Sequence, residues 1–254
     1  DVLSASQNDD KIAWYEQEGE GGPVQQTYVP DNNFEQALID LGYDDALDDS
    51  VFTENISGVT GLNVDDKEIN DLTGIEDFTA LTGLGCADNE LSSLDLSANT
   101  GLTQLSCNTN QLTSLDVSNN TALTYLDCQD NQLTSLDVSS NTALTSLNCE
   151  INQLTILDVS ANTALTLLYC MGNQLIHLNM KNGVTDGLTS FDATDNSLIC
   201  IEVNAEDVDY ATENWTSENG NIDVGVIFDE YCVPEGYTYI SDNNFEQALI
   251  GLGY

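Results

Sequence analysis

Leucine and cysteine recur through the middle of the chain with a period of 21 residues. The cysteines that mark the five full blocks are Cys86, Cys107, Cys128, Cys149 and Cys170. The second block is LTQLSCNTNQLTSLDVSNNTA, and a sixth, degenerate block, LTSFDATDNSLICIEV, begins at Leu188. A fixed period of this length is typical of a solenoid, in which each repeat packs only on its neighbours.

Each block divides into two similar halves, L-x-x-L-x-C-x-x-N-x and L-x-x-L-D-V-S-x-N-x-x. Apolar positions bracket single polar residues in each half, which is the pattern of a short strand. In the second block the side chains expected to point inward are Leu102, Leu105, Cys107, Leu112, Leu115 and Val117. The pattern predicts two strands per coil and two short parallel sheets around a narrow core, with neighbouring coils about 4.8 Å apart.

Asparagine forms two further columns, for which we predict a structural role. The first contains Asn89, Asn110, Asn131, Asn152 and Asn173, continued by Asn196, and the second contains Asn99, Asn120, Asn141 and Asn162. A buried carboxamide can replace the backbone partners that are lost where a strand turns. The repeat cysteines are expected to be small apolar core residues, because stacked parallel side chains suit disulfides poorly and no histidine or C-x-x-C motif accompanies them.

These blocks resemble the leucine-rich-repeat family, in particular the bacterial class with 21-residue repeats called IRREKO. The resemblance covers about residues 60–200 and rests on the nested L-x-x-L-x-x-x-x-N halves. It implies a β-rich solenoid without long convex helices, a role in protein interaction or adhesion, and no catalytic residues.

The segment before the repeats, VPDNNFEQALIDLGYDDALDD, predicts a helix that caps the solenoid. Asp31 or Asn32 would cap this helix and Gly42 would end it. Its expected apolar face contains Phe34, Ala37, Leu38 and Leu41. The following residues are similar to the irregular first coils of internalin-like repeat proteins, so we predict a helical N-terminal cap.

After the repeats, the segment from Cys200 to Cys232 resembles the cap that follows such repeats in secreted proteins of marine Bacteroidetes. The resemblance implies a disulfide between these two cysteines, which would stabilise the cap by roughly 3–4 kcal/mol. Two free thiols are the alternative. The expected domains are a propeller-like tail or linker at 1–27, the N-terminal cap with irregular first coils at 28–79 and the repeats at 80–199. The C-terminal cap is expected at 200–234 and the start of a second cap at 235–254.

Residues 239–254, YISDNNFEQALIGLGY, repeat the cap sequence YVPDNNFEQALIDLGY of residues 28–43. We therefore expect a second repeat domain to follow. The opening DVLSASQNDDKIAWYEQEG resembles the tail of an FG-GAP or VCBS repeat, although the calcium loop of that family is missing. Both features indicate a fragment of a longer protein.

The charge is extreme, with 44 acidic residues, three lysines or arginines and a formal net charge of −41. Such a chain repels phosphate backbones and anionic lipids, so nucleic-acid binding and a membrane role are not expected. No apolar stretch reaches the roughly 18 residues of a membrane helix. A solvated acidic surface explains most of this charge, while cationic partners and divalent ions remain alternatives.

An aspartate column follows the second half-repeats: Asp95, Asp116, Asp137 and Asp158. Like charges at one strand spacing repel by about 1 kcal/mol per pair in water. Hydrogen bonds from neighbouring serines and threonines could relieve this repulsion. Calcium bridging adjacent carboxylates and a docking strip for a basic partner are the alternatives, and no other cofactor is expected.

Outward residues of the first half-repeats vary from coil to coil, unlike the aspartate column. We predict a binding surface there, formed by Gln104, Tyr125, Asp127, Asn148, Leu167, Tyr169 and Met171. Exposed tyrosine, leucine and methionine are enriched in interface cores. Neutral drift between duplicated repeats would also produce such variation.

The function predicted from these features is an extracellular interaction or adhesion module, secreted or on the cell surface, with a protein partner. The alternative is a carbohydrate-binding or scaffolding segment of a larger secreted enzyme, with a glycan as its ligand. The one histidine, His177, is expected on an outward position beside Lys181, and the sequence carries no H-E-x-x-H motif or phosphate-binding glycine loop. The chain itself is therefore not expected to be an enzyme.

Overall fold

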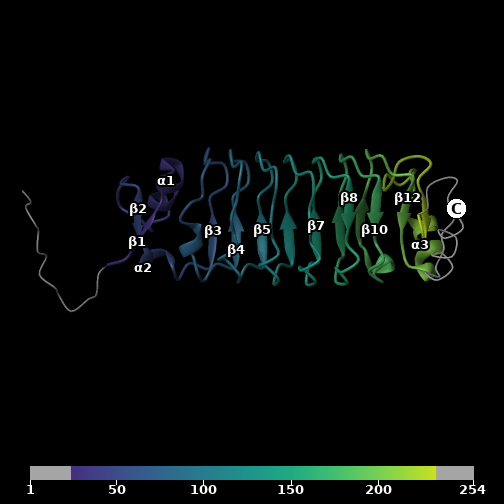
Figure 1. Cartoon of the computed structure of the whole chain (residues 1–254), viewed down its shortest axis with the longest axis horizontal. Helices are drawn as coiled ribbons and strands as arrows, with labels where there is room; N and C mark the ends of the chain where they lie inside the picture. The colour runs from purple at the N-terminus through teal and green to yellow at the C-terminus, as the bar shows by residue number, and fades with distance from the viewer. Residues whose placement is uncertain (1–23, 233–254) are drawn as a thin grey trace, which may run out of the picture.

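A computed structural model describes residues 24–232 of the chain. The FG-GAP-like opening and the second copy of the cap sequence lie outside these residues, apart from the last few residues of the predicted tail. The described part winds into an elongated solenoid with a cap at each end (Figure 1). Among these residues no helix is long and apolar enough to cross a membrane.

Most of the described strands have three residues and belong to successive coils of the solenoid. The strands are β1 Gln26–Tyr28, β2 Ser50–Phe52, β3 Gly61–Asn63, β4 Gly83–Gly85, β5 Gln104–Ser106, β6 Tyr125–Asp127, β7 Ser146–Asn148, β8 Ile156–Asp158, β9 Leu167–Tyr169, β10 His177–Asn179, β11 Ser190–Asp192, β12 Cys200–Glu202 and β13 Ile227–Asp229. The helices are α1 Asn32–Asp40, α2 Thr53–Ile56 and α3 Val208–Asn214, with single 3-10 turns at Ile75–Asp77, Thr185–Gly187 and Ala205–Asp207.

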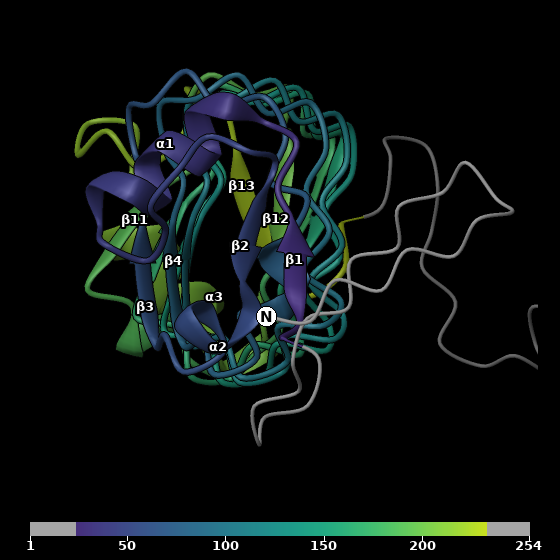
Figure 2. The same ribbon diagram turned by 90° about the vertical axis from the view of Figure 1, so that its left-hand side faces the viewer.

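The larger sheet has seven parallel strands in the order β3-β4-β5-β6-β7-β9-β11. Its register pairs Leu105 with Leu126 and Leu126 with Leu147, so each coil returns after 21 residues. Viewed along the axis, β3, β4 and β11 lie on one side of the core and β12 lies on the other (Figure 2). The predicted parallel-sheet solenoid is confirmed.

The second sheet is shorter than predicted. It has four parallel strands in the order β8-β10-β12-β13, and the corresponding segments of the three preceding coils are not strands. Those coils carry Ser93, Ser114 and Ser135 where β8 begins with Ile156. Isoleucine favours extended backbone more than serine does, so the second ladder forms only toward the C-terminal end.

The core contains the leucine and cysteine columns along its whole length. Leu105, Leu126 and Leu147 are fully buried, and the five repeat cysteines are buried free thiols. Burial raises the pKa of the Cys107 and Cys149 thiols to about 12, which keeps them protonated and unreactive. The prediction that these cysteines are core residues is confirmed.

Both asparagine columns connect each coil to the one before it. In the first column, Asn131 donates from Nδ2 to the carbonyl of Cys107 in the preceding coil (3.1 Å) and accepts from the amide of Leu112 at Oδ1 (3.0 Å). In the second column, Asn141 donates to the carbonyls of Val117 (3.0 Å) and Asn120 (2.9 Å). The asparagines therefore have the structural role that was predicted.

Helix α1 covers the N-terminal end of the core, as predicted, and Asp31 is its cap. Asp31 Oδ1 accepts the amides of Asn33 and Phe34, while Oδ2 accepts those of Asn70 and Asp71 in the first coil. One carboxylate thus fixes the helix to the solenoid. Phe34 and Leu38 are buried, but Leu41 is exposed because it follows the last helical residue. Its assignment to the apolar face was wrong.

The C-terminal cap is closed by the disulfide between Cys200 and Cys232, whose Cα atoms are 5.6 Å apart. Trp215 follows α3 and fills the end of the core, with its ring centroid 4.6 Å from that of Phe191 and 5.7 Å from that of Phe228. The predicted disulfide-closed cap is confirmed.

Candidate interaction surface

The predicted binding residues lie together on the outer face of the seven-stranded sheet, which we call the variable face. Strand register places Gln104, Tyr125 and Leu167 in one column. Asp127, Asn148 and Tyr169 form a second column beside it. Met171 follows β9 by two residues and lies at the edge of the same face. The structure therefore brings all seven predicted residues onto one surface.

The apolar residues of the variable face are less exposed than the sequence suggested. Tyr125 is 38% exposed, whereas Leu167, Tyr169 and Met171 are half-buried. The hydroxyl of Tyr169 donates to Ser190 Oγ on β11 (2.8 Å), which holds the ring along the sheet. These side chains form a partly apolar surface and are themselves partly covered by their neighbours.

Carboxylates of the variable face are partly desolvated and repel one another. Partial burial raises the pKa of Asp127, although its carboxylate accepts the amide of Gln129 and the hydroxyl of Tyr125. Partial burial also raises the pKa of Glu150, and the charges of Asp192 and Asp127 raise it further. Among residues 24–232, no cationic side chain forms an ion pair with these carboxylates.

On the opposite face, hydrogen bonds lower the pKa values of the aspartate column instead of raising them. The amides of Ser97, Ser118 and Ser139 each donate to the aspartate two residues earlier at 2.9 Å. Hydrogen bonds from these serines lower the pKa values of the column members Asp95, Asp116 and Asp137. Among residues 24–232, no group of three or more acidic, histidine or cysteine side chains is arranged to hold a metal ion. Serine donors thus relieve the predicted repulsion.

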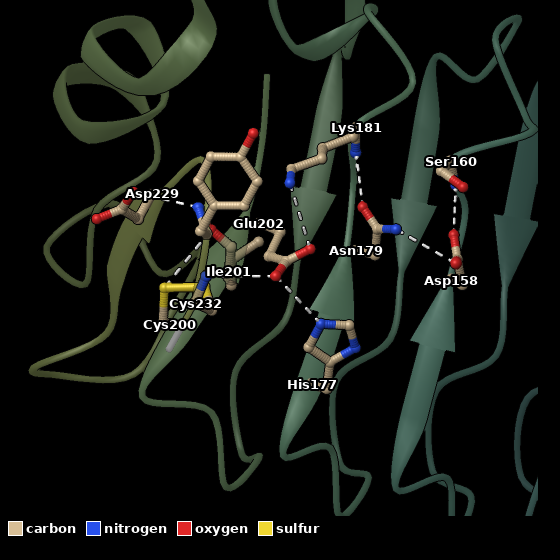
Figure 3. A network of polar contacts seen from close by, with 11 residues as sticks. Asp158, Ser160, His177, Asn179, Lys181, Cys200, Ile201, Glu202, Asp229 and Cys232 are labelled. Atoms are coloured by element: carbon tan, nitrogen blue, oxygen red, sulfur yellow. Dashed lines mark hydrogen bonds and ion pairs between the residues drawn. A yellow bond between two sulfur atoms is a disulfide. The ribbon is translucent and has the colours of Figure 1, made fainter. Parts of the chain in front are cut away.

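A polar network that the sequence did not reveal joins the last coils to the C-terminal cap (Figure 3). His177 Nε2 lies 3.6 Å from Glu202 Oε1, and Lys181 Nζ lies 3.7 Å from Glu202 Oε2. Glu202 Oε1 also accepts the amide of Cys232 (3.3 Å), and Lys181 Nζ lies 4.2 Å from the ring centroid of Tyr231. These contacts give His177 and Lys181 a structural role at the cap.

Comparisons with known proteins agree with this geometry. The functional domain of InlJ from Listeria monocytogenes, which includes a cysteine ladder, aligns with a TM-score of 0.57 and 32% sequence identity over 70% of this chain and 52% of that chain. Internalin C2 from the same species aligns with a TM-score of 0.59 and 19% identity over 72% of this chain and 99% of that chain. This chain has a leucine-rich-repeat fold.

Internalin inlF from Listeria monocytogenes has the same fold, with a TM-score of 0.60 and 21% identity over 79% of this chain and 56% of that chain. The leucine-rich-repeat chain thus spans about half of the InlJ and inlF structures. A family model for the LVIVD repeat matches residues 150–170. The search of curated proteins found no match.

Proposed function

We propose that the chain is an extracellular protein-interaction module that binds its partner on the variable face. The observation that carries this proposal is the contrast between the two faces of the solenoid. Outward residues of the seven-stranded sheet change at every coil, whereas the opposite face repeats aspartate and serine in four successive coils. A requirement of the fold alone would keep both faces equally uniform.

Extracellular location is supported by the disulfide between Cys200 and Cys232, since disulfides persist mainly in oxidising compartments. The internalin-like structural neighbours also support a role in protein interaction. The nested 21-residue repeat supports the IRREKO class, while the marine Bacteroidetes origin and the propeller-like opening rest only on sequence resemblance. A role in adhesion is one form that this interaction could take.

The test compares two double variants of the full chain for binding to an array of extracellular protein domains. Leu167→Ser with Tyr169→Ser changes the variable face, and Ile156→Ser with Ile176→Ser is the matched control on the other face. The control residues are 54% and 63% exposed, so their replacement leaves the core intact. We expect the first variant to lose partner affinity by about tenfold or more and the control to retain it. Equal binding by both variants would reject the proposed surface.

The alternative, a carbohydrate-binding segment of a larger secreted enzyme, is tested with a glycan array. Exposed tyrosine on a flat sheet, such as Tyr125, could also stack on a sugar ring. Selective glycan binding that is lost with Tyr125→Ser and Tyr169→Ser would favour this alternative. A uniform absence of glycan binding beside a positive protein array supports the interaction module.

A further inference from the structure

The C-terminal half of the variable face combines carboxylates with an apolar strip. Strand register places Tyr169 between Asn148 and Asp192, with Asp127 one strand beyond Asn148. Glu150 and Met171 follow β7 and β9 by two residues each, and the amide after Glu150 bonds to the carbonyl of Met171 (2.9 Å). We call the set Asp127, Glu150, Leu167, Tyr169, Met171 and Asp192 the acidic-aromatic patch.

The carboxylates of this patch have no cationic partner within the described part of the chain. Both ion pairs among residues 24–232 involve Glu202, which lies on the smaller sheet. The charges of Asp192 and Asp127 raise the pKa of Glu150, after the effect of partial burial, so the three groups are close enough to repel. A positive group placed among them would remove this repulsion and gain charge-assisted hydrogen bonds.

The opposite face is acidic too, but it differs from the patch in the side chains beside its carboxylates. The column members Asp95, Asp116 and Asp137 each accept a serine amide. In the patch, Asp127 and Asp192 likewise accept the amides of Gln129 and Thr194. That face has no aromatic residue in the aspartate column, and the side chains beside it are mainly serine and threonine. The apolar strip therefore distinguishes the acidic-aromatic patch from the aspartate column.

The apolar strip suits the methylene stem of a lysine or arginine side chain whose charged end meets the carboxylates. The ring of Tyr169 is held by its hydrogen bond to Ser190, and Leu167 and Met171 flank it while half-buried. A cation can lie over a tyrosine face while its methylene stem covers neighbouring apolar surface. The carboxylates on either side would then receive the N–H donors.

We propose that the acidic-aromatic patch docks a lysine- or arginine-rich segment of a protein partner. The proposal rests on the proposed function, whose surface it shares, and adds the chemistry of the partner. The formal charge of −41 would also speed the approach of such a partner, because opposite charges steer association. Neutral partners and divalent cations are competing occupants that the experiment must distinguish.

The probe is a fluorescent peptide of alternating lysine and glycine, measured by fluorescence anisotropy at physiological salt with the full chain. One variant combines Asp127→Asn, Glu150→Gln and Asp192→Asn in the patch. The matched control combines Asp95→Asn, Asp116→Asn and Asp137→Asn, which changes the net charge by the same amount on the other face. We expect the patch variant to bind the peptide about tenfold more weakly than the native chain, because it loses three partly exposed ion pairs. The control should bind less than about twofold more weakly.

Equal losses in the two variants would show that the peptide follows net charge alone, and would overturn the proposal. Failure of the native chain to bind the peptide would overturn it too. Calcium binding measured by calorimetry, if lost in the patch variant and competitive with the peptide, would assign the patch to a metal instead. Tyr169→Leu, which keeps an apolar side chain, should weaken binding severalfold if the ring contacts the cation.

These outcomes are separable from failure of the proposed function. If Leu167→Ser with Tyr169→Ser abolishes binding on the protein array while the lysine peptide shows no preference, the surface is correct and the partner chemistry is wrong. If neither assay distinguishes the variable face, both proposals fail. Thermal unfolding of each variant confirms that a lost signal does not reflect a lost fold.

Discussion

Replacing Asn131 with alanine should destabilise the solenoid more than the same change at Asn141. Asn131 Nδ2 contacts the carbonyls of Cys107, Cys128 and Gln129 at 3.1–3.2 Å, and its Oδ1 accepts the amide of Leu112. Since Nδ2 has two hydrogens, these contacts amount to about three hydrogen bonds. At about 1 kcal/mol or more for each buried backbone group left without a partner, the expected loss is about 3–4 kcal/mol.

Asn141 provides a matched comparison, because the alanine change removes the same atoms from a site that is also buried. Its Nδ2 donates to the carbonyls of Val117 and Asn120, whereas its Oδ1 has no hydrogen-bond partner among the described residues. The expected loss is therefore about 2 kcal/mol. Gln132→Ala, at an exposed neighbouring position, should change stability by less than about 0.5 kcal/mol.

Urea unfolding followed by circular dichroism gives the free energies, and the slopes show whether the transitions are comparable. Hydrogen exchange of the flanking coils checks whether the loss is local or extends along the solenoid. An equal or larger loss for Asn141→Ala would refute the reasoning, because the two sites differ mainly in the bonds that they make. A loss below about 1 kcal/mol for Asn131→Ala would refute the structural role of the column.

Three further predictions concern charge, metal and backbone strain. Because the fold raises the pKa of Glu150, the contribution of this carboxyl to the free energy of unfolding is fully present below the unfolded pKa and is lost as pH rises through the folded pKa. In urea unfolding, Glu150→Gln should therefore be more stable than the native chain at pH 7 and equal to it at pH 3. We expect equal melting temperatures in excess calcium and in chelator, since serine amides already bond to the aspartate column; a calcium-induced rise that is lost with Asp116→Asn and Asp137→Asn would instead show that the column binds calcium. Ile151 has a φ of 50°, a left-handed conformation that costs a β-branched residue about 1–2 kcal/mol, so Ile151→Gly should raise the urea midpoint, and an unchanged or lower midpoint would argue against strain there.

The repeats could be predicted because each of their positions recurs in equivalent surroundings. The spacing of Leu105, Leu126 and Leu147 determines the register, and one coil is enough to assign inward and outward positions. The shorter second sheet could have been foreseen from Ser135 and its equivalents, since the strands of that sheet begin with Ile156, His177, Cys200 and Ile227 instead of serine. Strand propensity decides that difference, whereas the leucine pattern is the same in every coil.

Features that depend on a single contact between distant segments were not predicted. Glu202 meets His177 and Lys181 only after two coils and the cap are in place, and no repeat marks it. Likewise, Asp31 or Asn32 was predicted as the helix cap, but the bonds of Asp31 to the first coil require the helix to be docked. On the variable face, the sequence identified outward positions but not that Tyr169 would lie along the sheet.

Removing one complete coil tests the account most directly, because both faces and the proposed binding surface depend on a 21-residue turn. Deletion of residues 122–142 joins two equivalent positions of neighbouring coils, whereas deletion of residues 122–135 does not. We predict that the first variant remains folded, with hydrogen-exchange protection retained in both flanking coils, and that the second loses this protection. Loss of protection after the 21-residue deletion, or its survival after the 14-residue one, would contradict the coil geometry.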